Sequence, residues 1–296
     1  MPANRATQSR RGISFLYGLP WTLTILLFWG FPVIYSFVMG FTDYRLLQEG
    51  FHWIGWGNYS ALFQDPAFLQ SLKNTFIFVI GTIPTTTVIA LLLALLVNPQ
   101  FKGQGFFRSA YFIPSITSLV VVSLIFTNLY SRGGYLATLT GLVGLTPPEN
   151  GFLYDNGTAL YSIMAMDVWM SVGYYMLIFL AGLKGIPDEL YEAAEINGAS
   201  PLRQFFSITL PLLKPVTLFI IVINSIKSFQ VFVEIFVMTS GKFNTATTVY
   251  NIYERGLTTQ YEFGYASAAS YVLFVIIGIF SLAQFALFRR ERTYSW

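Results

Sequence analysis

Long stretches without any charged residue constrain this chain more than any other feature. Gly12 to Thr42 contains no Asp, Glu, Lys or Arg, and neither does Asn74 to Phe101. About 20 apolar residues in a helix cross the core of a bilayer, and a backbone in lipid must satisfy its own hydrogen bonds. The chain is therefore predicted to be an all-α membrane protein. Its 10% content of charged residues, against roughly 25% in soluble domains, agrees with this.

Four such stretches, together with two further apolar stretches that carry one or two charged residues, predict six transmembrane helices in one membrane domain over 13–288, with short tails at 1–12 and 289–296. The spans are expected at about 13–41, 74–98, 109–130, 160–183, 216–238 and 263–288. The first stretch is too long for the apolar core of a cleaved signal peptide, so it is expected to remain as a span.

The basic residues predict the orientation. An even number of crossings puts both termini on one side, and that side collects eleven of the 17 Lys and Arg residues. They are Arg5, Arg10, Arg11, Lys102, Arg108, Lys184, Arg203, Lys214, Arg289, Arg290 and Arg292. Short cytoplasmic loops carry an excess of Lys and Arg. Both termini, and the loop between the fourth and fifth spans, are therefore predicted to be cytoplasmic.

That loop, at 187–212, has the pattern of two short helices at the membrane surface. Glu189 to Glu195 is rich in good helix formers, and Asn197-Gly198 favours the left-handed turn that ends a helix. Ser200-Pro201 is typical of an N-cap followed by proline at the first helical position. Leu210-Pro211 is expected to end the second helix before the fifth span.

Two spans carry ionisable side chains at membrane depth, where such groups usually face a bundle interior or a wet cavity. Lys227 lies about 20 Å along its helix from Lys214, at ~1.5 Å per residue. On the antiparallel fourth span, Ser171 falls at the depth of Lys227, and Asp167 lies one turn further out. We therefore expect Asp167 within reach of Lys227, whereas Glu234 is expected near the outer interface.

The sequence lacks the motifs of a self-contained enzyme. It has no Gly-rich loop ending in Gly-Lys-Ser/Thr, so the chain is predicted not to hydrolyse ATP. It contains no cysteine and a single histidine, His52, and no catalytic set or metal-ligand set is evident. No cofactor and no metal are expected in this chain.

Several motifs, spread over most of the chain, resemble the carbohydrate-type permease subunits of ABC importers. They are Trp56-Gly57-Asn58-Tyr59, Asn74-Thr75, Tyr111-Phe112-Ile113-Pro114 after Arg108, Glu192-Ala193-Ala194 with Gly198, Ile208-Thr209-Leu210-Pro211, Ser228-Phe229-Gln230-Val231-Phe232 and Gly264-Tyr265-Ala266-Ser267-Ala268. Ser240-Gly241-Lys242 departs from the Gly-Gly-Pro turn of many relatives. The resemblance implies a permease subunit in a bacterial or archaeal cytoplasmic membrane that imports a di- or oligosaccharide, a polyol or a related solute.

The resemblance also implies partners. These are a homologous second permease subunit, two ATPase subunits that carry ATP and Mg²⁺, and an extracytoplasmic solute-binding protein. In that family the helix before the glycine of the cytoplasmic loop docks on an ATPase subunit and couples it to alternating access. The implied coupling residues are Glu192, Ala193, Ala194 and Gly198.

The solute contacts implied by the resemblance lie on the fourth and fifth spans. They are Asp167, Met170, Ser171, Tyr174, Ile226, Lys227 and Gln230. A buried Asp167–Lys227 pair that only holds the two spans together is a structural alternative. The alternative function is a self-sufficient secondary transporter or channel with Lys227 and Asp167 as an ion site. The lysine leaves open whether the solute is partly anionic.

Overall fold

The protein is described from a computed structural model, which covers residues 17–142, 144 and 146–289. These residues form helices and loops, with isolated β-bridges at Thr42–Trp53 and Ser131–Gly151. The predicted tail at 1–12 lies outside the described residues, as does the predicted tail at 289–296 beyond its first residue.

The described residues divide into two compact units. The first comprises the chain up to Gln64 together with Ile252–Val272, and the second comprises Asp65–Asn251 and the chain from Leu273 onward. Helix α14 (Phe263–Arg289) contributes its first part to the first unit and its remainder to the second.

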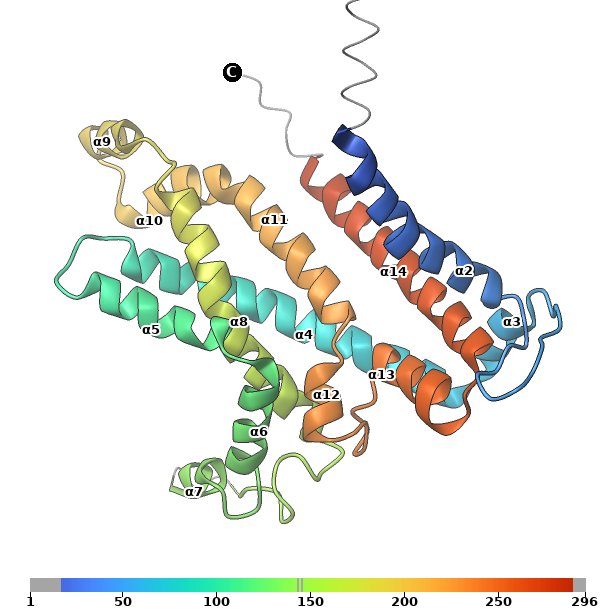
Figure 1. Ribbon diagram of the computed structural model, residues 1–296. Helices are drawn as coiled ribbons and strands as arrows, with labels where there is room; N and C mark the ends of the chain where they lie inside the picture. Colours follow the sequence, from blue (N-terminus) through green and yellow to red (C-terminus); the bar gives the residue numbers. More distant parts are fainter. Residues whose placement is uncertain (1–16, 143, 145, 290–296) are drawn as a thin grey trace, which may run out of the picture. The chain divides into compact units, whose positions relative to one another are not determined.

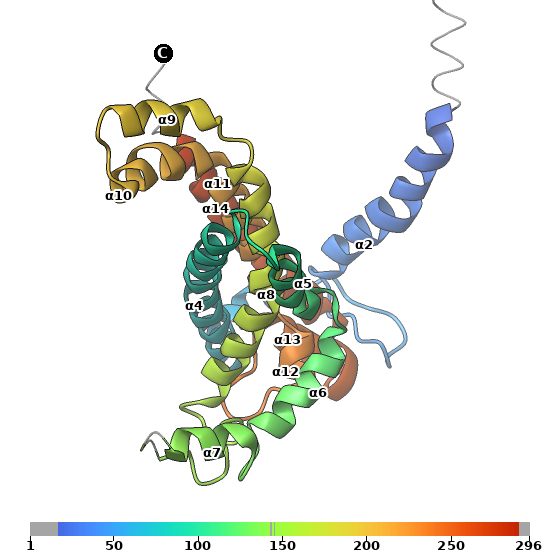
Figure 2. The same ribbon diagram turned by 90° about the vertical axis from the view of Figure 1, so that its left-hand side faces the viewer.

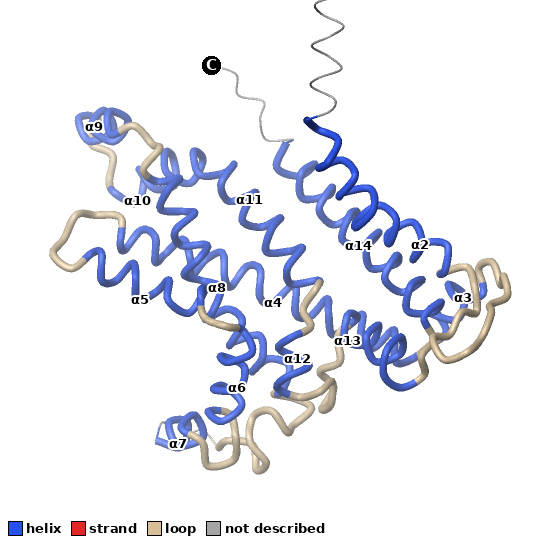
Figure 3. Tube along the Cα trace, in the orientation of Figure 1, coloured by secondary structure: helices blue, strands red, loops and turns tan. Residues whose placement is uncertain are grey.

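The all-helical membrane architecture predicted from the sequence is confirmed. Among the described residues, five helices are long and apolar enough to cross a membrane: Tyr17–Met39, Pro66–Val97, Ala159–Leu183, Pro201–Phe229 and Phe263–Phe288. A sixth span is formed if α5 (Gln104–Ile116) and α6 (Leu119–Leu129), which bend by 96°, are counted together. Figure 3 shows helices joined by loops in both units.

The first unit packs its N-terminal span against the start of α14. Its further elements are η1 (Leu26–Gly30), α2 (Phe31–Met39), α3 (Gly57–Gln64) and η3 (Glu254–Thr259). The Tyr271 hydroxyl donates a hydrogen bond to the Val33 carbonyl. A Cβ at Gly264 would lie 2.1 Å from the Thr42 carbonyl oxygen. The Gly264–Ala268 motif therefore supplies the small residues that this close approach requires.

Asn58, from the Trp56–Tyr59 motif, has a structural role in the first unit. Its side chain is buried, and its amide donates to the carbonyls of Gly40 at 2.9 Å and Thr42 at 2.8 Å. The last carbonyls of a helix have no partner within the helix. Asn58 therefore satisfies the backbone just after α2 and fixes the turn that follows.

The second unit is built around α8 (Ala159–Leu183), which lies between α4 (Pro66–Val97), α5 and α11 (Leu210–Phe229), as Figures 1 and 2 show. Its other helices are α6, α7 (Tyr135–Leu142), α9 (Asp188–Ile196), α10 (Pro201–Gln204), η2 (Phe205–Thr209), α12 (Val233–Met238) and α13 (Thr248–Tyr253), which reaches the unit boundary. In the most apolar 18-residue stretch of α8, 72% of the residues are buried, whereas 39% are buried in the corresponding stretch of α4. A helix that is apolar on all sides belongs in an interior, so α8 fixes the positions of its neighbours.

The contact between α8 and α5 is close enough to require a glycine. A Cβ at Gly173 would lie 1.9 Å from the Tyr111 carbonyl oxygen. Nearby, the Ser115 hydroxyl donates to the Met170 carbonyl at 2.7 Å and accepts the Tyr174 N–H at 3.1 Å. The motif that begins at Tyr111 is therefore part of this packing contact.

The helix that contains the predicted second span begins before that span. Helix α4 starts at Pro66, and the Asp65 carboxylate caps it by accepting the Ala67 N–H at 2.9 Å. Lys73, which precedes the predicted span at 74–98, therefore lies within the helix. The polar first part of α4 forms hydrogen bonds with the loop before α13. The Asn74 amide donates to the carbonyls of Asn244 and Ala246 at 2.9 Å each.

The fifth span also differs, at both of its ends. The prediction that Leu210-Pro211 ends the preceding helix is wrong, because α10, η2 and α11 form one continuous helix. In the π-turn η2, the Leu210 N–H donates to the Phe205 carbonyl, and this wider turn lets the helix continue past Pro211, which has no N–H. At the other end α11 stops at Phe229, and the separate helix α12 begins at Val233.

Candidate functional site

An ion pair joins α8 and α11 inside the second unit. The Lys227 Nζ lies 2.6 Å from Asp167 Oδ1 and 2.6 Å from Ser171 Oγ. This is the contact predicted from helix spacing, and the structure confirms it. A lysine or a carboxylate persists at membrane depth where it is paired or solvated, and this pair meets that requirement.

The two members of the pair are buried very differently. The Asp167 side chain is 1% exposed and that of Lys227 is 41% exposed. Among the described residues, Asp167 Oδ2 has no hydrogen-bond partner. A buried acceptor without a partner is costly, so this oxygen is a site at which a donor from another molecule would be stabilising.

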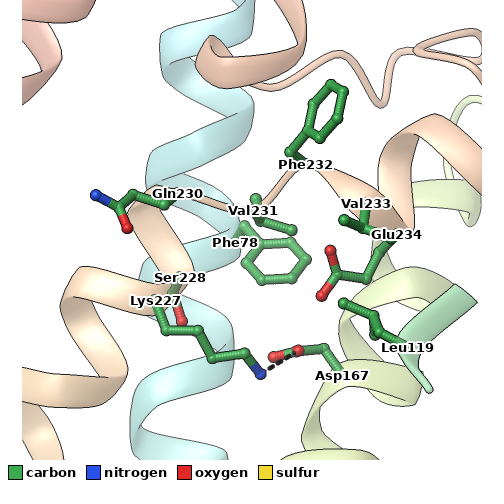
Figure 4. A pocket seen from close by; sticks show the side chains of 10 residues that line it. All are labelled: Phe78, Leu119, Asp167, Lys227, Ser228, Gln230, Val231, Phe232, Val233 and Glu234. Atoms are coloured by element: carbon green, nitrogen blue, oxygen red, sulfur yellow. Dashed lines mark hydrogen bonds and ion pairs between the residues drawn. The ribbon is translucent and has the colours of Figure 1, made fainter. Parts of the chain in front are cut away.

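A cavity of about 210 Å³ opens beside this pair. Figure 4 shows its lining, which consists of Phe78, Leu119, Asp167, Lys227, Ser228, Gln230, Val231, Phe232, Val233 and Glu234. The side chains therefore combine apolar surface with carboxyl, ammonium, hydroxyl and amide groups. This mixture of apolar surface and a few convergent polar groups is typical of small-molecule sites.

The cavity exists because the helix is broken between α11 and α12. The backbone N–H of Gln230 donates to the backbone carbonyl of Lys227 at 3.0 Å. The Thr247 hydroxyl donates to the Val231 carbonyl at 2.9 Å. Non-helical backbone at membrane depth is tolerated where protein or a polar cavity satisfies it. The motif Ser228–Phe232, which was identified in the sequence by resemblance alone, spans this break.

The other predicted solute contacts are distributed around the pair. Met170 is buried in a core cluster, Ile226 is partly buried, and Tyr174 is 45% exposed with its ring against Tyr175. None of these side chains is in the cavity lining. Of the seven predicted residues, the structure brings Asp167, Lys227 and Gln230 to the cavity wall and holds Ser171 beside them through Lys227.

Glu234 was not predicted as a site residue, yet it belongs to the cavity. Its side chain is 3% exposed and contributes to the cavity lining, whereas its position near the outer interface stays a prediction. In a continuous helix Glu234 would lie on the face of Lys227 and Gln230, and this spacing was visible in the sequence. The helix break moves it beside the Asp167 end of the cavity (Figure 4).

A second cavity, of about 750 Å³, lies between α4, α5 and α8. Its lining is mainly apolar, and no side chain in it carries a formal charge. It is larger than the cavity at Lys227, but it offers few hydrogen-bonding groups to a polar solute. The residues described by the structure contain no cluster of three or more His, Cys, Asp or Glu side chains that could hold a metal ion.

The second predicted site is the exposed hairpin formed by α9 and α10. The N–H of Gly198 donates to the Glu195 carbonyl and that of Ala199 to the Ala194 carbonyl, both at 2.9 Å. This pair of bonds, with φ of +74° at Gly198, is the Schellman arrangement that ends a helix. Ser200 then caps α10 by accepting the Arg203 N–H. Glu192 and Ala193 are exposed on α9.

Comparison with known proteins places the chain among transport proteins. The family described as binding-protein-dependent transport system inner membrane component matches residues 54–293. The arabinooligosaccharides transport system permease protein AraP of Bacillus subtilis (strain 168) is 33% identical over 94% of this chain and 89% of its own length. The lactose transport system permease protein LacF of Rhizobium radiobacter is 32% identical over 94% of both chains.

The fold is shared with a solved transporter. A chain in the crystal structure of a bacterial alginate ABC transporter, in complex with alginate pentasaccharide-bound periplasmic protein, superposes with a TM-score of 0.83 at 23% identity. The match covers 97% of this chain and 98% of that chain.

Proposed function

The chain belongs to the family of binding-protein-dependent transport system inner membrane components, and from this premise we propose that it is a transmembrane permease subunit of an ATP-driven sugar importer. The proposal is carried by the polar cavity beside the Lys227–Asp167 pair, at a break in an apolar helix. It is supported by the two relatives named above, which are permease proteins for arabinooligosaccharides and for lactose.

The sugar would bind in this cavity during transport. Asp167 Oδ2 would accept a sugar hydroxyl, and the remaining N–H of the Lys227 ammonium would donate to another. Gln230 supplies both a donor and an acceptor. The full set of proposed contacts is Asp167, Met170, Ser171, Tyr174, Ile226, Lys227 and Gln230; the four that lie outside the lining in this structure would join it in another state of the transport cycle.

We further propose that the chain lies in the cytoplasmic membrane of a bacterium or archaeon, with both termini in the cytoplasm. The distribution of Lys and Arg supports this orientation. The exposed helix α9 would then face the cytoplasm and dock on an ATPase subunit through Glu192, Ala193 and Ala194, with Gly198 shaping the turn behind it. The helix thereby serves as the coupling helix between the fourth and fifth spans.

The partners of the proposed importer are a homologous second permease, two ATPase subunits and an extracytoplasmic solute-binding protein. ATP and Mg²⁺ would be bound by the ATPase subunits, because this chain lacks the Gly-rich phosphate loop. Closure of the ATPase dimer would pull on α9 and move α8 and α11, so that the cavity opens to one side of the membrane at a time.

Reconstitution into liposomes tests the proposal. The assembled complex should take up sugar when ATP and loaded binding protein are present, and each should be required. This chain alone should neither hydrolyse ATP nor accumulate sugar. Sugar uptake by the isolated chain under a proton or sodium gradient would overturn the proposal and favour the self-sufficient secondary transporter.

A further inference from the structure

Glu234 adds a second carboxyl group to the cavity. Its side chain is 3% exposed, and Figure 4 shows its carboxyl group pointing into the cavity toward the end where Asp167 lies. Asp167 and Lys227 are the charged groups that act on it. The cavity thus contains two carboxyl groups and one ammonium group.

Two of the three N–H bonds of the Lys227 ammonium group are committed to the protein. Lys227 Nζ donates to Asp167 Oδ1 and to Ser171 Oγ, at 2.6 Å each. The Ser228 hydroxyl lies 3.1 Å from the Thr82 hydroxyl and is paired with it. In Figure 4, the Gln230 side chain points away from the Glu234 carboxyl group. The end of the cavity between Asp167 and Glu234 therefore offers mainly acceptors, including Asp167 Oδ2, which has no partner among the described residues.

Such a wall distinguishes sugars by charge. A sugar hydroxyl donates a hydrogen bond and can satisfy a carboxylate oxygen. A sugar carboxylate has no proton to donate at neutral pH and brings a like charge to Glu234, because Lys227 is paired with Asp167. Rejection of a competitor by like charge is an established way to obtain specificity.

We propose that Glu234 is a specificity-determining residue that, together with Asp167, restricts the cavity to uncharged sugars and rejects sugars that carry a carboxylate. This inference rests on the proposed function, and it names the substrate class of the same cavity. It also assigns a role to Lys227, which neutralises Asp167 rather than attracting an anionic solute.

The test measures binding to the permease without the binding protein, which would otherwise select the solute first. Ligand-observed NMR on the purified, nucleotide-free complex detects weak binding. The probes are lactose, maltose and trehalose, each paired with an analogue in which one hydroxymethyl group is oxidised to a carboxylate. The wild-type complex should bind at least one neutral sugar about tenfold or more tightly than its charged analogue.

Glu234→Gln keeps the shape and removes the acid, so it should reduce that ratio about tenfold while neutral sugar still binds. Glu234→Asp should preserve the ratio. Glu149→Gln, in an exposed loop outside the cavity, is the matched control and should change nothing. Gln230→Glu adds an acid to the cavity and should increase the ratio, so charge selection remains testable even if Glu234→Gln fails to assemble.

An unchanged ratio in an assembled Glu234→Gln complex, or in Gln230→Glu, would overturn the inference and leave the proposed function intact. Preference of the wild type for a charged analogue would do the same. Failure of the wild type to bind any neutral sugar, together with no sugar uptake by the complete transporter, would overturn both.

Discussion

The hydroxyl groups of Tyr191 and Thr209 lie 2.8 Å apart, and their hydrogen bond joins the exposed helix α9 to the π-turn that leads into α11. Helix α11 carries Lys227 at its far end. This hydrogen bond is a physical link through which the proposed movement of α9 would reach the helix that lines the cavity. π-turns within helices often occur at functional positions, and this one lies where a coupling movement would enter α11.

Tyr191→Phe should weaken coupling without preventing assembly. The lost bond contributes about 1 kcal/mol, so ATPase stimulation by loaded binding protein should fall about fivefold. Thr209→Val should have the same effect, and the double variant should be no worse than either, since both remove one interaction. Tyr135→Phe, at an exposed position, is the control. Additive losses in the double variant would show that the two hydroxyl groups act separately.

Gly198→Val should abolish import while the protein still inserts. The φ of +74° at Gly198 is unfavourable for a β-branched residue by about 1–2 kcal/mol, although a Cβ there would meet nothing within 4 Å. The damage would therefore come from the turn and not from a clash. Gly198→Asn should be better tolerated, because Asn adopts this conformation more readily.

Co-purification of the ATPase subunits, measured beside sugar uptake, distinguishes a lost turn from lost expression. Glu192→Lys leaves the turn unchanged and should weaken ATPase binding by reversing an exposed charge on α9. Normal uptake by both Gly198→Val and Glu192→Lys would contradict a docking role for α9.

Helix spacing predicted the ion pair because it depends on two quantities that a sequence contains, the rise per residue and the antiparallel course of neighbouring spans. The turn at Gly198 was predicted for a similar reason, since the left-handed conformation has a strong residue preference. Both features are local or are fixed by simple helix geometry.

The path of the helices was less predictable. Hydropathy reports which residues avoid water, and it does not report whether the backbone between them is helical. The break after Phe229 and the bend between Ile116 and Leu119 both lie within stretches that hydropathy marks as single spans. Asp65-Pro66 has the pattern of a helix start, but the second span was predicted only from residue 74, after several polar residues. Their partners lie far away in the sequence, as for Asn74 and Asn244.

Gly173→Ala should destabilise the second unit. The new Cβ would lie 1.9 Å from the Tyr111 carbonyl oxygen, which is backbone and cannot rotate away. Overpacking of this kind costs about 1–3 kcal/mol, and thermal unfolding in detergent should show a lower midpoint. Gly141→Ala is the control, because it is also in a helix and its Cβ would meet nothing within 4 Å. An unchanged midpoint for Gly173→Ala would show that α5 and α8 can separate at no cost.

Asp43 should make the loop before α3 sensitive to acid. Its carboxylate accepts the His52 backbone N–H, and this bond, followed by the contact with the His52 ring, lowers the pKa of Asp43 below its usual value. The stabilisation is therefore present above about pH 4, the ordinary pKa of the residue, and is lost as the pH falls through the lowered value. Tryptophan fluorescence of the wild type should show an acid transition that Asp43→Asn lacks. Identical titrations would exclude this contact as its cause.

Lys227 and Asp167 allow the structural role of the pair to be separated from its role in transport. Lys227→Met leaves Asp167, which is 1% exposed, as an unpaired buried charge, and this should destabilise the subunit by about 3 kcal/mol. Adding Asp167→Asn removes that charge, so the double variant should recover much of the lost stability. Thermal unfolding of the two variants, compared with the wild type, measures this recovery.

The transport of the double variant then decides what the pair does beyond stability. If the cavity receives the sugar beside Lys227, the double variant should assemble and bind loaded binding protein normally, yet its sugar uptake should fall or shift in preference, because an amide and a thioether replace the two charged groups that face the solute. Sugar-stimulated ATPase activity and uptake should be measured on the same preparation. Wild-type uptake with wild-type preference would remove Lys227 from the sugar site and leave it as a charge that holds α8 and α11 together.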